Sequence, residues 1–571
     1  MAEKVRILTA RPHRLLAPLI EELGQWNRQE KNVVLLVPEQ LTLQTEREIF
    51  ERLHLEGSFY LDILSPSRFY ERVLENGGRD QREPLNSAGR RMAVSLALER
   101  LEDRLGYYGA LSLRTGFVEK TAALITDLKR GGLSPEMLAE YAEQLPAGIS
   151  REKLGDLALI YAQYEAVLRN RFSDSEDQLQ YVAGRLESSG FLRGKHVYVY
   201  GFDTLPDQMM RLLTAAAPLC ESLSVALLWE HEGAADGELF LPIRQGVGRF
   251  TEMLQKAGLS TEFVPYPRRE LNAPEAIQSL ERGLFTLRPR AMEGRQDSVF
   301  LSSGLSPYEE ATLMTRQVLR LLAAGMEIEK IAVLYPDDGG YAFAVSAALR
   351  DSGIPFYSDE KLSALSHGLP RYLLCALKAA AGGWQNRDVL GMAKSGYSPL
   401  AFDESCELEN YVFTCGVNRA RWLSPFTRGD ESLRERCEDY RRRLMEPVLR
   451  MREGLVQARD AAASITAVFG LLKDVGAYER LQQEETELLE KGLAVRAGQN
   501  SQVWQAILTL MDQMVRLSDR QRIPLKHIST RMECGFSAVS LAALPRREKC
   551  STWAYWAMPC RKTWRPCSCW D

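Results

Sequence analysis

The order of secondary-structure patterns along the chain restricts its fold more than any other feature. A strand pattern at residues 5–8 is followed by helix-spaced apolar residues over 15–27 and by a second strand pattern at 33–37. The second strand pattern is apolar at every position, which is typical of a strand buried on both faces of a parallel sheet. A strand, a helix and a buried strand in this order predict an α/β domain.

Long amphipathic helices then interrupt the α/β pattern. Helical spacing dominates residues 85–194, and strand patterns return at 196–202 and 223–228. A segment rich in charge and proline, residues 268–295, separates this half of the chain from the next. We interpret the helical stretch as an insertion within the first α/β domain.

The second half of the chain repeats this arrangement. Residues 299–301 begin a second α/β unit, which continues with a helix pattern over 308–324 and a strand pattern at 331–335. From residue 367 to 517 the pattern is again mostly helical. The sequence therefore predicts two α/β domains, each with a large helical insertion.

The composition excludes few functions. Hydrophobic residues make up 45% of the chain and charged residues 26%, as is ordinary for a soluble globular protein. The net charge of −4 gives no overall signature of nucleic-acid binding, yet a local basic groove on an acidic body stays compatible with it. No apolar run is long enough for a membrane span, and the N-terminus lacks the apolar core of a signal peptide. We therefore expect a cytoplasmic protein with no membrane partner.

The loop after the first strand is a candidate phosphate site, because strand–loop–helix units bind phosphates at this position. Here the loop begins Thr9-Ala10-Arg11-Pro12 and continues through His13 to Arg14. It has no glycine and no Gly-Lys-Thr, and its proline removes one amide donor. Arg11 and Arg14 could still hold an anion, but we favour a degenerate loop that is kept for packing.

A nucleotide site of this kind also needs an acidic residue for magnesium at the end of a neighbouring strand. The best candidate strand ends in Tyr200-Gly201-Phe202-Asp203, with Tyr200 at the expected place of the carboxylate. Asp203 is available nearby. The sequence therefore predicts no active nucleotide site.

Polar residues follow two predicted strands and make candidate binding positions. Gln40 and Thr42 follow the strand at 33–37, and Arg68 follows Ser65-Pro66-Ser67 before another helix. In α/β sheets, ligand-binding groups collect beyond the carboxyl ends of strands. Neutral amides and hydroxyls suit base edges or phosphate oxygens, and arginine suits phosphate. The alternative interpretation is that these residues cap helices or lie on a solvated face.

No metal or nucleophile constellation is evident elsewhere in the sequence. The six histidines are isolated from other ligand-type residues at helical spacing. The last four cysteines, Cys550, Cys560, Cys567 and Cys569, lack the closely spaced pairs of a zinc site. We predict no catalytic residues, no metal site and no cofactor in this chain.

Several segments together resemble a known family. They are residues 35–42, 65–69, 174–177, 197–208, 306–311, 331–334, 353–357 and 408–411. In this order they are similar to motifs in the B subunit of bacterial AddAB-type (RexAB) helicase–nucleases, here called AddB. The similarity runs collinearly over residues 1–545.

The resemblance implies a superfamily-1 helicase fold with two RecA-like domains, each with a large α-helical insertion. The predicted boundaries are 1–84 with 195–290 for the first domain, 85–194 for its insertion, 296–366 for the start of the second, 367–530 for its insertion, and 531–545 for the return to the second domain. The resemblance also implies an AddA-type partner in a heterodimer, which uses Mg-ATP as the motor. AddB would hold DNA from single- and double-stranded ends and scan for a short Chi hotspot. Full-length members continue into a nuclease domain with a 4Fe–4S cluster.

By position in these motifs, Gln40, Thr42 and Arg68 are the best DNA-contact candidates, with Phe202 as a base-stacking residue. Arg68 would position phosphate or read a base edge, while Gln40 and Thr42 would orient the strand. Many family members keep Gly-Lys-Thr in the first loop and an aspartate before the later Gly-Phe, and this chain keeps neither. ATP binding by Thr9, Ala10, Arg11 and Arg14 is therefore not expected.

The last residues depart from the family. Four tryptophans and four cysteines crowd the end of the chain, which suits neither the preceding domain nor a solvated tail. We hypothesise that residues 546–571 are a frameshifted tail, which would leave the second RecA-like domain incomplete and the nuclease with its cluster cysteines absent.

The sequence thus predicts the helicase-like part of an AddB protein that acts in repair of double-strand DNA breaks by homologous recombination. Two alternatives remain open at this point. One is an active ATP-dependent helicase, and the other is an assembly protein that supports the motor without touching DNA.

Overall fold

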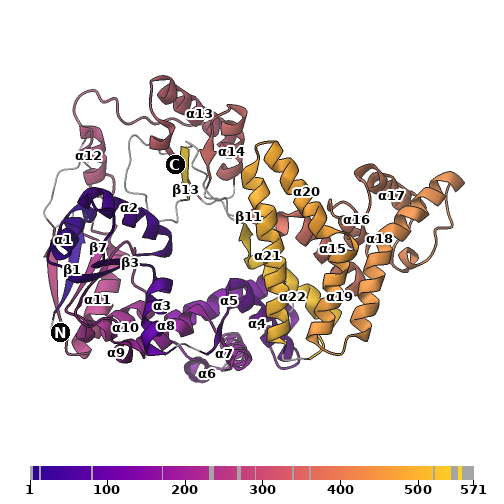
Figure 1. The fold of residues 1–571 in the computed structure, drawn as a ribbon, viewed down its shortest axis with the longest axis horizontal. Helices are drawn as coiled ribbons and strands as arrows, with labels where there is room; N and C mark the ends of the chain where they lie inside the picture. The colour runs from indigo at the N-terminus through magenta and orange to yellow at the C-terminus, as the bar shows by residue number, and fades with distance from the viewer. Residues whose placement is uncertain are drawn as a thin grey trace.

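The structure is a computed structural model, and it describes most of the chain. The described residues are 4–11, 14–78, 81–112, 114–169, 171–230, 237–266, 272–289, 291–336, 340–358, 362–518, 521–541 and 551–555. Figure 1 shows a first α/β unit at the N-terminal end, a second one above it, and a large helical body to one side.

The first unit is built on a six-stranded sheet that is parallel at every pairing. Its strand order is β3-β2-β6-β7-β1-β8. The strands are β1 (Lys4–Ala10), β2 (Asn32–Leu36), β3 (Leu61–Leu64), β6 (Lys195–Val199), β7 (Ser222–Leu228) and β8 (Ser260–Pro265). The predicted parallel sheet is confirmed, and the helical stretch does lie between its third and fourth strands in sequence.

Helices cover both faces of this sheet, so successive strand residues enter different cores. In β2, Val33 and Leu35 pack in one core with helices α1 (Leu16–Arg28) and α2 (Thr42–Leu53). Val34 and Leu36 pack in the opposite core. The helices there are α3 (Pro66–Gly77), α8 (Ser175–Ala183), α9 (Leu186–Ser189), α10 (Asp207–Ala216) and α11 (Leu241–Lys256). Burial on both sides explains why β2 has no polar alternation.

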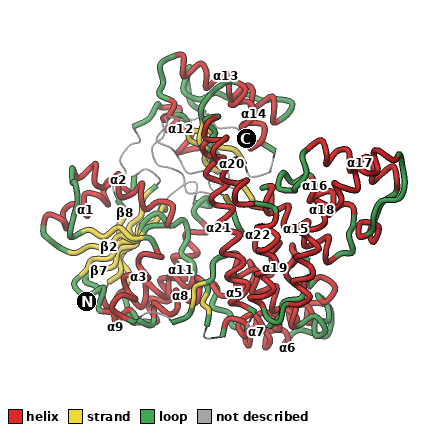
Figure 2. Tube along the Cα trace, turned by 45° about the vertical axis from the view of Figure 1, so that its right-hand side comes forward, coloured by secondary structure: helices red, strands yellow, loops and turns green. Residues whose placement is uncertain are grey.

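The two predicted helical insertions share one hydrophobic core. The first contributes α4 (Ser87–Arg100), α5 (Thr115–Arg130) and α7 (Ile149–Leu168), with α6 (Pro135–Gln144) beside them. The second contributes α15 (Gly368–Ala381), α16 (Asn386–Ala393), α17 (Phe402–Cys415), α18 (Glu431–Gln457), α19 (Ala461–Asp474), α20 (Ala477–Glu490), α21 (Ala494–Leu517) and α22 (Leu525–Ala538). Figure 2 shows these helices as one continuous body beside the sheet. Segments far apart in sequence thus form a single packed unit.

A buried ion pair joins the two insertions where α4 packs on α22. Glu99 accepts two hydrogen bonds from the Arg531 guanidinium, at 3.0 and 2.5 Å, and both side chains are almost fully buried. His527 Nδ1 lies 3.0 Å from the same carboxylate. Burial by itself would raise the pKa of Glu99, but the hydrogen bonds from His527 and Arg531 hold that pKa below its ordinary value.

The second α/β unit is smaller. It holds α13 (Pro307–Ala323), α14 (Tyr341–Asp351) and a parallel sheet in the order β10-β13-β9. Its strands are β9 (Ala332–Tyr335), β10 (Phe356–Tyr357) and β13 (Ser551–Tyr555). Short pairs join β4 (Glu83–Pro84) to β5 (Phe172–Ser173) and β11 (Leu362–Ser363) to β12 (Ser540–Leu541).

The structure differs from the sequence prediction at the start of this unit. Residues 299–301 form no strand, and Phe300 is 68% exposed. The proline-rich segment contains a helix, α12 (Glu275–Gly283), because proline occupies its N-terminal flank rather than its interior. Within the supposed frameshifted tail, β13 pairs with β9 and β10, and the other residues of 546–571 lie outside the described residues.

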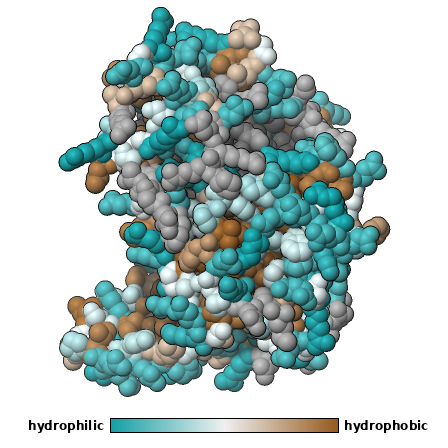
Figure 3. Space-filling model, turned by 90° about the vertical axis from the view of Figure 1, so that its left-hand side faces the viewer, coloured by the Kyte–Doolittle hydropathy of each residue, from teal (hydrophilic) through white to brown (hydrophobic). Residues whose placement is uncertain are grey.

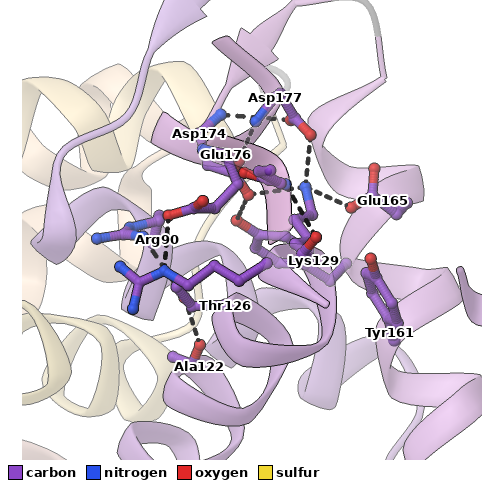
Figure 4. A network of polar contacts seen from close by, with 12 residues as sticks. Arg90, Ala122, Thr126, Lys129, Tyr161, Glu165, Asp174, Glu176 and Asp177 are labelled. Atoms are coloured by element: carbon purple, nitrogen blue, oxygen red, sulfur yellow. Dashed lines mark hydrogen bonds and ion pairs between the residues drawn. The ribbon is translucent and has the colours of Figure 1, made fainter. Parts of the chain in front are cut away.

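Lys129 lies at the centre of a buried ion cluster that fastens the first insertion (Figure 4). Its ammonium group is 2.7 Å from Glu165, 2.7 Å from Asp174 and 2.8 Å from Asp177, and its side chain is only 6% exposed. Tyr164 donates a further hydrogen bond to Asp174, at 3.0 Å. Burial disfavours the charge on Lys129, but the three carboxylates outweigh it and raise the pKa of the ammonium above its ordinary value.

The same cluster organises the start of α8 and reaches the sheet unit. Asp174 caps α8 by accepting hydrogen bonds from the amides of Glu176 and Asp177. The carbonyl of Lys129 accepts from the Gln208 side chain of α10, at 2.9 Å. Residues 174–177, which carried part of the family resemblance, therefore bind Lys129, and the backbone of Lys129 contacts the first sheet unit.

None of the helices in the described ranges is long and apolar enough to cross a membrane. The face of the molecule in Figure 3 is mostly hydrophilic, with apolar residues in separate patches.

We predict that Lys129→Met destabilises the protein by about 3–5 kcal/mol, because it leaves the buried Asp174 and the partly buried Asp177 and Glu165 without their cation. The fall in the midpoint of thermal unfolding measures this effect. Lys120→Met, an exposed position on the same helix, is the matched control and should change the midpoint little. Equal midpoints for the two variants would contradict a stabilising role of the cluster.

We also predict a pH signature for Glu99. Because its folded-state pKa is lowered, the stability it contributes is present above its ordinary pKa of 4.5 and is lost as the pH falls toward the folded-state value. The stability difference between the wild type and Glu99→Gln should therefore shrink as the pH falls below about 5. Thermal unfolding over a pH series measures this difference, and Glu102→Gln, at an exposed position, is the control. A stability difference between the wild type and Glu99→Gln that stays constant with pH would contradict the prediction.

Candidate nucleic-acid interface

The predicted site residues lie beyond the carboxyl ends of four strands of the first sheet. Gln40 follows β2, Arg68 follows β3, Phe202 follows β6, and Arg11 follows β1. Because the sheet is parallel, all four strands end at the same edge. The strands β3, β2 and β6 are neighbours, so the loops after them form one half of the edge, and the loop after β1 belongs to the other half.

In the loop after β2, the Gln40 side chain is exposed and Thr42 is buried. Residues Glu39–Leu41 form a short 3-10 helix, η1, in which the Gln40 side chain is exposed. Thr42 is the first residue of α2 and is only 9% exposed. Its hydroxyl donates to the carbonyl of Pro38 at 3.2 Å. The structure therefore places Thr42 in a local helix-start contact, as the alternative interpretation describes, and leaves Gln40 open to a ligand.

The loop after β3 positions Arg68 at the start of a helix. Ser65 caps α3 by accepting from the Arg68 amide, and Pro66 occupies the first helical turn. The Arg68 side chain is exposed. Its backbone is thus fixed by the cap while its guanidinium remains accessible to an anion.

Glu39, a residue that no sequence pattern singled out, ties the first two loops together. Its carboxylate accepts a hydrogen bond from the Ser67 amide at 3.0 Å. Burial raises the pKa of Glu39, but hydrogen bonds from Ser67 and Ser65 and the charge of Arg68 outweigh it and lower that pKa. The carboxylate therefore stays ionised and fixes the spacing between Gln40 and Arg68.

Gly201 brings the loop after β6 against the loop after β2. Its φ is +85°, a conformation that side chains disfavour. A Cβ at this position would lie 2.9 Å from Cδ1 of Leu41 and 3.2 Å from Cδ of Pro38. Glycine is needed here both for the turn and for the close approach of the two loops.

Phe202 is partly buried and packs against the core beneath the sheet edge. The adjacent Tyr200 is 1% exposed and belongs to the core on the other face. Tyr200 therefore fills the strand-end position at which a magnesium-binding carboxylate would be needed. Asp203 is exposed two residues beyond Gly201.

The other half of the edge differs from the predicted loop. Thr9 and Ala10 are strand residues, because β1 continues its pairing with β7 through Thr9↔Leu227 and Ala10↔Leu228. Both are buried, and the Thr9 hydroxyl has no hydrogen-bond partner among the described residues. Pro12 and His13 of the predicted loop lie outside the described residues.

Arg11 and Arg14 are both held by carboxylates. Arg11 Nε donates to Glu230 at 2.5 Å, and Arg14 donates to Glu281 at 2.9 Å. The exposed fractions of the two arginine side chains are 13% each. Glu230 stands just after β7, where the parallel sheet would place it near β1, whereas no pattern in the sequence indicated Glu281.

The described residues offer no ligand set for a metal or an iron–sulfur cluster. They contain no group of three or more histidine, cysteine, aspartate or glutamate side chains placed to hold a metal ion. The six described cysteines, Cys220, Cys375, Cys406, Cys415, Cys437 and Cys534, are free thiols. The four terminal cysteines lie outside the described residues.

The first half of the chain matches the model of a known protein family. Residues 11–281, which contain the first sheet, its helices and the first insertion, match the family model for the N-terminal region of ADDB. The chain resembles AddB. The matched residues include all three loops that carry Gln40, Arg68 and Phe202.

Individual relatives extend this similarity over most of the chain. Each carries the name of the B subunit of an ATP-dependent helicase/deoxyribonuclease. The relative from Alkaliphilus oremlandii is 26% identical over 533 residues, which are 90% of this chain and 47% of the relative. The relative from Heliobacterium modesticaldum is 28% identical, with 90% and 45% covered, and that from Alkaliphilus metalliredigens is 25% identical, with 92% and 48% covered. The chain thus spans about half the length of the AddB-type relatives that it matches.

We predict that Gly201→Ala destabilises the protein by about 1–3 kcal/mol and weakens any ligand binding at this edge, because the added Cβ strains the turn and pushes on Leu41. Thermal unfolding measures the first effect. Gly57→Ala is the matched control, since a Cβ there meets nothing within 4 Å. An unchanged unfolding midpoint in Gly201→Ala would show that the two loops do not depend on this contact.

Proposed function

We propose that this chain is the helicase-like part of the AddB component of an ATP-dependent helicase/exonuclease that acts in double-strand break repair by homologous recombination. In this proposal it holds a DNA strand and scans it for a Chi-type hotspot, while an AddA-type partner supplies the motor and uses Mg-ATP. The observation that supports it best is the convergence of Gln40, Arg68 and Phe202 on one sheet edge within an AddB-like region.

Each of these side chains has a distinct role in the proposal. Arg68 is exposed on a capped helix start, so its guanidinium can neutralise a phosphate while the amides of the first turn favour the same charge. Gln40 is exposed on η1 and can exchange hydrogen bonds with a base edge or a phosphate. Phe202 is partly buried, and the exposed part of its side chain can stack on a base.

The proposal assigns the domain organisation of the resemblance to the described units. The first sheet, residues 1–84 with 195–290, is the first RecA-like domain, and the α13–α14 unit, residues 296–366, begins the second. The helical stretches 85–194 and 367–530 are their insertions; α4, α5 and α7 of the first share one core with the second, whereas α8 and α9 pack on the first sheet. Residues 531–545 return toward the second domain.

We further propose that the described residues catalyse neither ATP hydrolysis nor DNA cleavage. The loop after β1 lacks Gly-Lys-Thr, Tyr200 fills the place of the magnesium-binding acid, and carboxylates hold both arginines. An active helicase chain would need an ATPase activity that depends on DNA and is lost on replacing Arg11 or Arg14.

The decisive experiment is binding of single-stranded DNA by the full chain in complex with its AddA-type partner, over a series of salt concentrations. Arg68→Ala should weaken binding about fivefold and reduce the salt dependence by about one counterion, because one phosphate contact is lost. Arg28→Ala is the matched control: this arginine is exposed at the end of α1, toward the opposite edge of the sheet, and its loss should leave affinity unchanged.

The same measurement distinguishes the alternative of a pure assembly role. If a folded complex binds DNA equally well with Arg68→Ala and Gln40→Ala, the chain supports the motor without contacting the strand at this edge. Equal loss in Arg68→Ala and Arg28→Ala would indicate non-specific charge attraction.

A further inference from the structure

The arginines of the loop after β1 hold two carboxylates from distant parts of the chain. Glu230 follows β7, the neighbour of β1 in the sheet, and lies 2.5 Å from Arg11 Nε. Glu281 belongs to α12, in the segment between the two α/β units, and lies 2.9 Å from Arg14 Nη2. Arg11 also donates to the backbone carbonyl of Glu281, at 3.3 Å. These contacts join the end of β1, the end of β7 and the connecting segment.

The four side chains are largely withdrawn from water. The exposed fractions are 13% for each arginine, 14% for Glu230 and 24% for Glu281. Arg11 also lies over the ring of Phe240, at the start of α11, with 5.8 Å from its central carbon to the ring centroid. Charge-assisted hydrogen bonds between side chains this well shielded are stronger than surface pairs, because water competes less for them.

We propose that Glu230 and Glu281 form an acid clasp that occupies the anion position of the loop after β1 and latches α12 onto the first sheet. In strand–loop–helix units this position takes the phosphates of a ligand. Here two carboxylates of the chain itself meet the positive charge. The positive charge of Arg11 and Arg14 is therefore balanced, and α12 is held in place, without a bound nucleotide.

The clasp has a mechanical consequence, because α12 begins the connection to the second α/β unit (Figure 1). On α12 only the small Ala276 is fully buried, Ile277 is partly buried and Leu280 is 40% exposed, so apolar packing supplies a limited part of its attachment. The ionic contacts at its C-terminal turn therefore add to the attachment that this packing provides. Opening the clasp would free one end of the connection and expose two arginines to an external anion.

Hydrogen exchange on the full chain, measured without DNA, tests the latch. Glu281→Gln keeps the shape of the side chain and removes its charge, so amide exchange across residues 275–283 should accelerate about tenfold or more. Glu275→Gln makes the same change at an exposed position on the same helix and should leave exchange within about twofold of the wild type. Equal exchange in the two variants would overturn the proposal.

A charge swap separates loss of the latch from misfolding. Arg14→Glu alone should release α12 and accelerate exchange at 275–283. Arg14→Glu combined with Glu281→Arg should restore slow exchange there. Unchanged exchange in β1 and β7 shows that the double variant is folded, and if such a protein does not regain slow exchange at 275–283, the pairing is overturned.

Binding of inorganic pyrophosphate is a second test. The wild type should bind it at least about tenfold more weakly than Glu281→Gln, and equal affinities would show that the carboxylates do not occupy the anion position.

Discussion

The parallel order of the first sheet is the constraint on which the remaining architecture depends. Parallel strands cannot be joined by tight turns, so each connection must cross the sheet and return, and every strand ends at the same edge. This one property collects the loops after β1, β2, β3, β6 and β7 along a single line. It also leaves room for a long insertion between β3 and β6, because that connection can be extended without disturbing the strand hydrogen bonds.

An insertion of this size needs its own attachment, and the chain supplies it with buried charge rather than with apolar surface alone. Lys129 faces Glu165, Asp174 and Asp177, so the cluster has more negative than positive charge. The excess is tolerable because Asp174 also accepts two helix amides and a tyrosine hydroxyl, and because burial raises the pKa of Glu165. Such a cluster disfavours other arrangements of these helices, because a displacement of α5 relative to α7 or α8 would leave a carboxylate without a donor.

The sequence reveals contacts that follow from periodicity and misses those made by single side chains over long distances. The run at 33–37 predicted β2 and its burial, and Ser65-Pro66 predicted the start of α3, because local patterns decide both. The sharing of one core by the two insertions had no local signal, since amphipathic helices do not indicate their partners. Glu39 and Glu281 were missed for the same reason: an exposed-looking carboxylate in a loop or linker has no pattern that reveals its partner. Nor did the sequence show that the Thr42 hydroxyl donates locally to the carbonyl of Pro38.

The distribution of charge bears on how such a chain could hold DNA. Many of its arginines already face carboxylates of the chain itself: the arginine-rich helix α18 pairs Arg436, Arg441, Arg442 and Arg443 with carboxylates, and the loop after β1 pairs Arg11 and Arg14. Neutralised arginines release few counterions on binding, so they add little electrostatic affinity. In the proposed function, strand holding at the β3-β2-β6 edge would therefore rely on a small number of directed contacts. Weak, directed contacts suit the proposed role, in which a partner's motor would move DNA past this chain, because a strand held tightly by many phosphate contacts would resist translocation.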